Sequence, residues 1–589
     1  MAEETEQQDD KSKDTVIEIP NGNSMIAEIP ETKIAITEEN RLSIEEPERD
    51  DQGDFITRIG NRIRKWKNKN KKWIKYVTMA IIFALYNTYL GFAINLTWND
   101  PPKWNKGVRS LLLFTIFVYF MILYYTFLKK YVIKPTLYGF YNIKCVNTVL
   151  NWKYFPWLIW VLIVLGLTIF LIIDSANNRY RLLSFSGLFV LILFGYLFSA
   201  HRKHIIWRQT LWGCLLQFIF GLMVLRWEPG RQFLETFADK VDVFLGYTDY
   251  GSKFVFDYLA TGELKDLPKQ NTIFAFKVLP VVLFFSFFTS ILYYYGIMQI
   301  LVLKVGWFLH KTIKTTACES VTASANIFLG LIETPLLIKP FIACMTKSEI
   351  HAVMTGGFAT IAGGVMAAYI SFGVNATHLL SASVMSAPAA LSFAKLFYPE
   401  TEETKTSIKH IKVEKGTEKN VLEAAVNGVT SAVNIVVNMA VNMIAFLAFV
   451  NFLDGTISWF GSLLGYDYIN FDWIVSKSFI PISVVMGIEW KDAEQVANLV
   501  GIKTIVNEFV AYQKLGELKK ANKISKRSEY IATYALCGFS NISAIGIQMG
   551  ALIAIAENKK SDIAVVSVRA LIAGAISCFM TACIAGSLI

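Results

Sequence analysis

Residues 501–512, Gly-Ile-Lys-Thr-Ile-Val-Asn-Glu-Phe-Val-Ala-Tyr, are the most informative stretch of this chain. They place Lys503, Asn507 and Glu508 inside a segment that is otherwise apolar enough to enter a membrane. A charge at bilayer depth costs at least ~2.5–3.5 kcal/mol on insertion scales, so charged residues kept there usually serve a function. The stretch therefore predicts a membrane protein with a polar site inside the bilayer.

The composition supports a membrane protein. Of the 589 residues, 54% are hydrophobic and only 18% are charged, whereas soluble domains carry about 25% charged residues. The net charge of +10 suggests nucleic acid as a partner, but the strongest basic cluster, residues 58–75, directly precedes the first apolar run. Basic residues at that place anchor a chain to anionic lipid on the cytoplasmic side. The lipid membrane, and no nucleic acid, is therefore the expected partner, and the N-terminus is expected to be cytoplasmic.

The remaining composition excludes several classes of site. The seven cysteines are scattered without paired ligand spacing, and the six histidines form no zinc motif. The N-terminal residues are acidic and polar, with no apolar core of a signal peptide. Residues 1–72 are predicted to be a disordered cytosolic tail that ends in the basic cluster.

Apolar runs predict the transmembrane helices. They lie at about 73–96, 109–128, 154–173, 182–199 and 272–298. Three of these runs fall in residues 73–180. Residues 204–226 mix Arg, Trp and Gln with apolar side chains, which predicts an interfacial amphipathic helix leading into a span.

Two later segments, about 312–345 and 472–516, are apolar but interrupted by Gly, Pro, Asn and Glu. After them come two similar heptapeptides, GFATIAG at 357–363 and GFSNISA at 538–544. Two interrupted hairpins, each followed by a glycine-broken helix, are typical of a duplicated transporter core whose broken helices expose backbone groups at the midplane. The predicted fold is an all-α polytopic membrane protein, with an inverted-repeat transporter core, two re-entrant helical hairpins and broken helices.

Residues 420–449 carry Asn427, Asn434, Asn438 and Asn442 on one helical face. Asparagines in membrane helices commonly hydrogen-bond between helices, so that structural role is the expected one.

The stretch 501–512 resembles the signature of the concentrative nucleoside transporter family at every defined position: Gly/Ala-x-Lys, three free positions, Asn-Glu-Phe-Val-Ala, then an aromatic residue or Met. The resemblance extends from about residue 180 to the C-terminus. It implies a transporter core in residues 181–589, preceded by three additional N-terminal transmembrane helices in residues 73–180. Supporting stretches are 324–328, 334–337, 383–388, 487–490 and 535–539. It implies a plasma-membrane importer of nucleosides, a multi-pass homotrimer that works by alternating access and is not an enzyme.

For the nucleobase, the resemblance implies contacts from the first hairpin. The family motif Gly-Gln-Thr-Glu-x-Pro stands here as Gly330-Leu331-Ile332-Glu333-Thr334-Pro335, so Glu333 is kept while two polar residues are replaced by Leu331 and Ile332. Val365 falls where the family packs an apolar side chain on the base. An apolar residue after this glycine accompanies purine preference in mammalian members, so a purine lean is expected.

For the ribose, the resemblance implies Glu489 as the second-hairpin carboxylate, with Asn541 and Phe539 beside the sugar. A carboxylate offers paired acceptors to two vicinal hydroxyls. The family serine after that asparagine is Ala544 here, and Ser543 lies one position earlier. One helical position rotates a side chain by about 100°, so Ser543 replaces it only if the helix is unwound.

For the coupling ion, the resemblance implies sodium held by the side chains of Asn326 and Thr360 and the carbonyls of Leu329 and Ile361. An all-oxygen shell suits a hard cation. No other cofactor is expected. A proton contribution from Cys537 or the glutamates is the alternative.

Asn507 and Glu508 invite a direct substrate role, but we favour a structural polar bridge within the second hairpin, through Lys503. Three other functions are weighed for the chain as a whole. An uncoupled pore would also line its path with polar groups, and an intramembrane enzyme would use Glu333 and Glu489 as an acid pair, although no accompanying nucleophile or metal motif is found. A transporter of the same fold with a non-nucleoside substrate is the strongest rival, because of Leu331, Ile332 and Ala544.

Overall fold

The computed structural model describes residues 66, 70–97, 108–124, 155–176, 179–263, 273–406 and 418–589. Within these ranges the regular structure is helical and no strand occurs, which confirms the all-α prediction. The predicted tail, residues 1–72, lies almost entirely outside them. The chain divides into two compact units, Met1–Pro102 and Lys103–Ile589.

The first unit contributes one long helix, α2 (Lys71–Thr97). Large apolar side chains such as Leu85 and Phe92 are exposed along it, as suits contact with lipid. Its polar side chains are satisfied within the helix: Asn87 Nδ2 donates to the carbonyl of Phe83 at 2.8 Å. An amide is tolerated next to lipid when a backbone carbonyl of the same helix accepts its hydrogen bond.

In the described part of the second unit, ten α-helices precede the first hairpin. They are α3 (Val108–Leu123), α6 (Phe155–Asp174), α7 (Tyr180–Leu197), α8 (Trp207–Gly221), α9 (Glu228–Gly246), α10 (Thr248–Phe256), α11 (Tyr258–Thr261), α12 (Phe274–Lys277), α13 (Leu279–Tyr294) and α14 (Ile297–Ile313). A π-turn, Leu222–Arg226, extends α8, and short 3₁₀ turns lie at Arg202–His204 and Glu557–Lys559.

The remaining helices contain the same order of elements twice. The first set is α15 (Ala317–Ala325), α16 (Glu333–Leu336), α17 (Lys339–Ile342), α18 (Lys347–Ala359), α19 (Gly363–Ser371) and α20 (Ala376–Phe397). The second set is α23 (Trp490–Ile505), α24 (Glu508–Lys520), α25 (Lys526–Leu536), α26 (Ile542–Ile555) and α27 (Lys560–Leu588), and α22 (Phe471–Val485) precedes it. Each set runs through a hairpin, a helix, a break and a further helix, and ends in a long helix.

The two sets share one core. α18 packs against α20 and α27, and α25 packs against the same two helices. Both long helices are well buried inside the unit, and small side chains such as Ala382, Ala389 and Ala585 allow the close approach. The breaks between α18 and α19 and between α25 and α26 are thus held by a common support.

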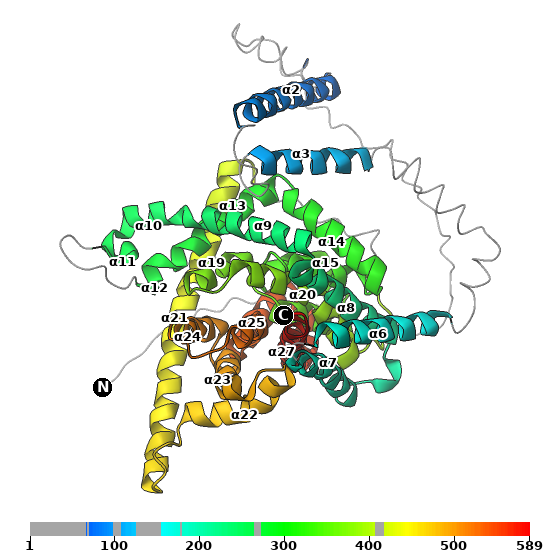
Figure 1. Ribbon diagram of the computed structural model, residues 1–589. Helices are drawn as coiled ribbons and strands as arrows, with labels where there is room; N and C mark the ends of the chain where they lie inside the picture. Colours follow the sequence, from blue (N-terminus) through cyan, green and yellow to red (C-terminus); the bar gives the residue numbers. More distant parts are fainter. Residues whose placement is uncertain are drawn as a thin grey trace, which may run out of the picture. The chain divides into compact units, whose positions relative to one another are not determined.

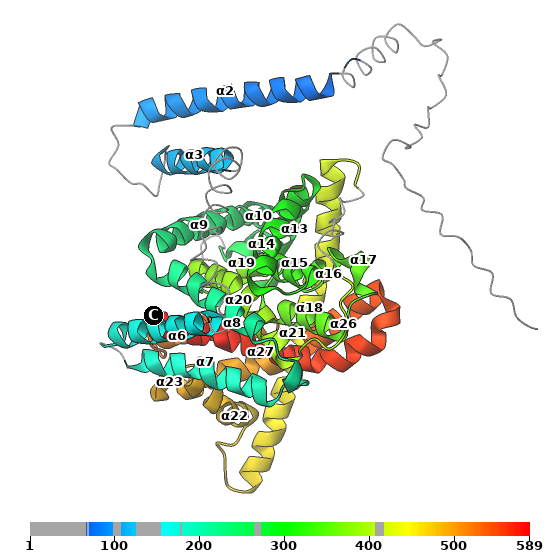
Figure 2. The same cartoon turned by 90° about the vertical axis from the view of Figure 1, so that its right-hand side faces the viewer.

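Between the two sets runs α21 (Val421–Leu463), drawn in yellow in Figures 1 and 2. Its 43 residues give a length of roughly 65 Å at about 1.5 Å per residue, about twice the hydrocarbon thickness of a bilayer. It packs along α13. This long helix forms a wall beside the duplicated elements.

Among the described residues, seven helices are long and apolar enough to cross a membrane, or eight if the bent pair α22 and α23 forms one more. Residues 207–226 are one of the seven, so the stretch predicted to be an interfacial helix leading into a span is itself long and apolar enough to cross. The strongly amphipathic helix is the next one, α9, whose first turn carries Glu228 and Arg231.

Candidate functional site

The two helix breaks meet. The backbone N–H of Phe539, between α25 and α26, donates to the carbonyl of Thr360, between α18 and α19, at 3.2 Å. Gly538 makes this approach possible, because a Cβ there would lie 2.7 Å from the carbonyl oxygen of Phe358. The two heptapeptides of similar sequence therefore lie side by side, each with backbone groups released from helical pairing.

The two hairpins present their carboxylates in the same way. In the first hairpin the chain turns between α15 and α16, and Glu333 is the first residue of α16. In the second set it turns between α23 and α24, and Glu508 is the first residue of α24. A carboxylate is favoured in the first turn of a helix by the exposed N–H groups. Glu333 also accepts a hydrogen bond from the N–H of Gly330, in the turn that precedes α16.

One cavity of about 970 Å³ joins these elements. It is walled by both hairpin tips, both helix breaks, α13 and α21. Of the predicted substrate residues, the lining includes Leu331, Ile332, Glu333, Val365, Phe539, Asn541 and Ser543. Its volume is at the upper end of the range for small-molecule sites.

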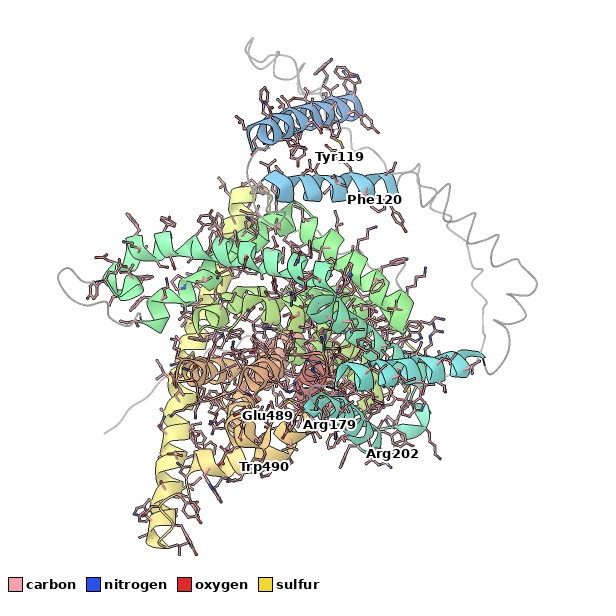
Figure 3. All side chains as sticks on the ribbon, viewed as in Figure 1. Tyr119, Phe120, Arg179, Arg202, Glu489 and Trp490 are labelled. Atoms are coloured by element: carbon pink, nitrogen blue, oxygen red, sulfur yellow. The ribbon has the colours of Figure 1, made fainter. Side chains whose placement is uncertain are left out.

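Glu489 does not line this cavity, and its predicted place there is corrected. It precedes α23 at the bend between α22 and α23, where the two axes meet at 117°. Its Oε2 pairs with Lys491 Nζ at 2.7 Å, beside the exposed Trp490, which Figure 3 labels with it. The carboxylate that the second hairpin brings to the cavity is Glu508.

Glu508 holds the second helix break in place. Asn541 Nδ2 donates to Glu508 Oε2 at 3.0 Å, and the Tyr369 hydroxyl donates to Oε1 at 3.1 Å. Asn541 Oδ1 in turn accepts from Ser543 Oγ at 2.7 Å and from the N–H of Ala544 at 2.9 Å. The orientation of the Asn541 amide is therefore fixed from both ends. Glu508 was interpreted as structural, and the structure gives it both a bridging role and a place on the cavity wall.

The other two polar residues of the signature have separate roles. Asn507 caps α24 by accepting from the N–H of Val510 at 3.0 Å, and it also lines the cavity. Lys503 is buried and donates to the carbonyl of Ala535 at 2.9 Å. A cation at the C-terminal end of α25 is stabilised by the helix dipole. The polar bridge thus joins the second hairpin to α25 and α26, where sequence reasoning expected a link within the hairpin.

The predicted sodium ligands lie at the first hairpin and the first break. Asn326 is 1% exposed, and neither its side-chain oxygen nor its nitrogen has a hydrogen-bond partner within the described ranges. Both Asn326 and Thr360 adjoin Gly356: a Cβ on Gly356 would lie 2.7 Å from Asn326 Nδ2, and Thr360 Oγ1 donates to its carbonyl at 2.8 Å. Leu329 lines the cavity and Ile361 lies in the break. A buried amide oxygen without a partner is a group that a hard cation satisfies.

Two parts of the site were not predicted from the sequence. Tyr369, the second partner of Glu508, has no local pattern that marks it. The asparagines of α21 were noticed as a helical face, but Asn427, Asn434 and Asn438 line the cavity instead of joining helices. The side chain of Asn442 lies outside what the structure describes.

Three sequence families match this chain. Residues 186–259 match the Na⁺ dependent nucleoside transporter N-terminus, residues 275–376 match a family described as nucleoside recognition, and residues 378–586 match the Na⁺ dependent nucleoside transporter C-terminus.

Similar proteins support the same grouping. Solute carrier family 28 member 3 of Rattus norvegicus is 47% identical over 453 residues, which are 74% of this chain and 63% of the relative. The protein of the same name in Eptatretus stoutii is 40% identical over 565 residues, covering 92% of this chain and 79% of that one. Sodium/nucleoside cotransporter 2 of Rattus norvegicus is 41% identical over 545 residues, covering 90% and 79%. The chain therefore spans less than two thirds of the first of these relatives.

Solved structures agree with the sequence relatives. CNTnw in an inward-facing substrate-bound state is 35% identical and superposes with a TM-score of 0.66, covering 69% of this chain and 98% of that one. A doubly substituted form in an outward-facing state gives a TM-score of 0.67 at 35% identity, covering 70% and 98%.

Proposed function

Because this chain belongs to the Na⁺-dependent, concentrative nucleoside transporter family, whose members are transporters and not enzymes, we propose that it imports nucleosides by sodium-coupled symport. The observation that carries the proposal is the convergence of two hairpin tips and two helix breaks on one cavity. Released backbone groups and the carboxylates of Glu333 and Glu508 at that point suit a polar solute and a cation.

The ribose is assigned to the second repeat. Glu508 replaces Glu489 as the carboxylate for the sugar hydroxyls, with Asn541 and Phe539 beside it. Ser543 supports Asn541 through its hydrogen bond, so that it acts as a positioning residue. Charge-assisted hydrogen bonds of this kind are roughly twice as strong as neutral ones.

The base is assigned to the first repeat. Leu331, Ile332 and Val365 offer an apolar surface to a planar ring, and Glu333 stands at its edge. The apolar pair in place of polar residues favours purines. The same pair favours the rival function, a related transporter whose substrate is no longer a nucleoside.

Sodium is assigned to Asn326 and Thr360 with the carbonyls of Leu329 and Ile361. One cation that crosses 100 mV contributes about 2.3 kcal/mol, or roughly a fifty-fold concentration ratio, before its own gradient is added. This is sufficient to drive accumulation. A proton as a second coupling ion is the alternative.

The wider arrangement is proposed from the same family membership. The transporter works by alternating access as a homotrimer in the plasma membrane, with its N-terminus in the cytoplasm. Residues 181–589 form the transporter core, residues 73–180 supply three additional helices, and residues 1–72 form a cytosolic tail.

The test is uptake of labelled adenosine, uridine and thymidine by cells that express the chain, in sodium or with choline in its place. We expect sodium-dependent accumulation, greatest for adenosine. Protein shown at the surface without sodium-dependent uptake of any of the three would reject nucleoside symport.

A further inference from the structure

Helix α21 brings three asparagines to the cavity. Asn427, Asn434 and Asn438 lie on the side that lines the cavity. One residue before two of them, Val433 and Val437 are exposed, with 43% and 52% of their surface accessible, on a different side of the helix. Ala432, Ile435 and Met439 line the cavity as well, so this helix brings both amides and apolar side chains to it.

Two amides on the cavity side, those of Asn434 and Asn438, have no hydrogen-bond partner among the residues that the structure describes. Asn451, further along α21, donates from Nδ2 to the carbonyl of Leu447 at 2.8 Å, as Asn87 of α2 does to Phe83. For Asn434 and Asn438, no such hydrogen bond, and none to a neighbouring helix, is formed with any residue of the described ranges. Since self-satisfied amides occur elsewhere on the same helix, these side chains are available to whatever fills the cavity.

Among the described residues of the first hairpin tip, Glu333 is the one polar side chain in the cavity lining. Leu331 and Ile332 present only apolar side chains. A nucleobase that leaves water loses free energy unless the donors and acceptors on its edge find partners. A carboxamide carries both a donor and an acceptor, and pairs with purine edges through both.

We propose that Asn434 and Asn438 of α21 hydrogen-bond the edge of the nucleobase, and so supply the polar contacts that Leu331 and Ile332 cannot make. The inference rests on the proposed nucleoside transport and deepens it. The first hairpin then packs apolar side chains on the ring of the base, and α21 hydrogen-bonds the edge of that ring.

The experiment compares adenosine with purine riboside, which lacks the 6-amino group, in sodium-driven uptake. The variants are Asn434→Ala and Asn438→Ala, and the matched control is Asn451→Ala on the same helix. We expect at least one of the two variants to raise KM for adenosine about threefold to tenfold, in line with the loss of one hydrogen bond, and to affect purine riboside less. The Asn451→Ala variant is expected to behave like the unsubstituted chain.

Equal KM changes for both substrates, or none in either variant, would overturn the inference. Where an alanine variant does not reach the surface, Asn434→Ser or Asn438→Ser gives the same comparison. Failure of the unsubstituted chain to take up adenosine in sodium would instead reject the proposed function, and this inference with it. Normal uptake by the unsubstituted chain with unaffected variants would reject the inference alone.

Discussion

Two carboxylates of the second repeat have different surroundings, and the structure separates their roles. Glu508 is 2% exposed and bridges Asn541 and Tyr369 on the cavity wall, whereas Glu489 pairs with Lys491 at a bend outside it. If Glu508 accepts ribose hydroxyls, only its loss affects substrate affinity.

The first prediction compares Glu508→Gln with Glu489→Gln. The change at 508 is expected to raise KM for adenosine roughly 10- to 100-fold, because hydrogen bonds to a charged group contribute about 1.5–3 kcal/mol. The change at 489 is expected to leave KM within about twofold, as for an exposed ion pair. Uptake normalised to surface protein measures both, and the opposite order would restore Glu489 as the ribose ligand.

The second prediction concerns the sodium site. Asn326→Ala removes a buried amide that has no internal partner, so it is expected to raise the sodium concentration for half-maximal uptake at least about tenfold. Asn498→Ala is the control, because that buried amide donates to Ser476 Oγ at 3.1 Å and lies outside the cavity lining. An unchanged sodium dependence in Asn326→Ala would remove Asn326 from the ligand set.

The sequence predicted most of these residues, but the turn at Glu489 was taken for the tip of the second hairpin instead of the turn at Glu508. The segment 472–516 contains two interruptions, at Gly487 and at Asn507, and either one fits a hairpin tip. The hydrogen bond between Glu508, at the start of α24, and Asn541, which caps α26 thirty-three residues later, shows that the second interruption leads to the cavity. A long-range contact of this kind leaves no local pattern.

At the scale of helices, a buried ion pair fastens the first hairpin to the core. Lys395 of α20 pairs with Glu319 of α15 and with Glu400, and donates to Ser348 Oγ of α18 at 2.9 Å. Both Lys395 and Glu319 are at most 3% exposed. Charges buried to this degree are tolerated only as partners.

The third prediction follows from that pairing. Lys395→Met leaves Glu319 buried without a counter-ion, so it is expected to destabilise the fold by about 3–5 kcal/mol. The double variant Lys395→Met with Glu319→Gln is expected to recover part of that loss. Thermal unfolding of the purified protein measures both, and a Tm of Lys395→Met equal to that of the unsubstituted protein would show that the pair does not hold the hairpin.

The fourth prediction concerns the crossing of the two breaks. In Gly538→Ala the new methyl would lie 2.6 Å from Cys578 Sγ and 2.7 Å from the carbonyl oxygen of Phe358, so a destabilisation of about 1–3 kcal/mol is expected. Gly550→Ala, in α26, meets nothing within 4 Å and is expected to be neutral or to stabilise by up to about 1 kcal/mol. Equal Tm values for the two variants would show that the breaks are not held at this contact.

The sequence predicted where helices break better than it predicted which residues the helices contact. The repeated heptapeptides marked both breaks, because each break needs glycine and a small polar residue wherever it lies. The spacing of the asparagines on α21 showed that they share one face of the helix. It did not show what that face contacts, because a 3.6-residue period carries no information about neighbouring elements.

At the scale of the molecule, composition was sufficient for the class of fold. Long apolar runs and a charge deficit predict a polytopic helical protein, and that prediction is confirmed. The function required the site as well, because a channel and a symporter share such a composition. Two hairpins and two breaks around a single cavity favour a transporter that binds one solute at a time.

The most direct test of this account is concentrative uptake by the purified protein in proteoliposomes. With an inward sodium gradient, internal labelled adenosine is expected to rise above the external concentration, and to fall to equality when an ionophore collapses the gradient. Adenosine that equilibrates at the same rate in sodium and in choline, and never exceeds the external concentration, would contradict sodium coupling and show an uncoupled pore.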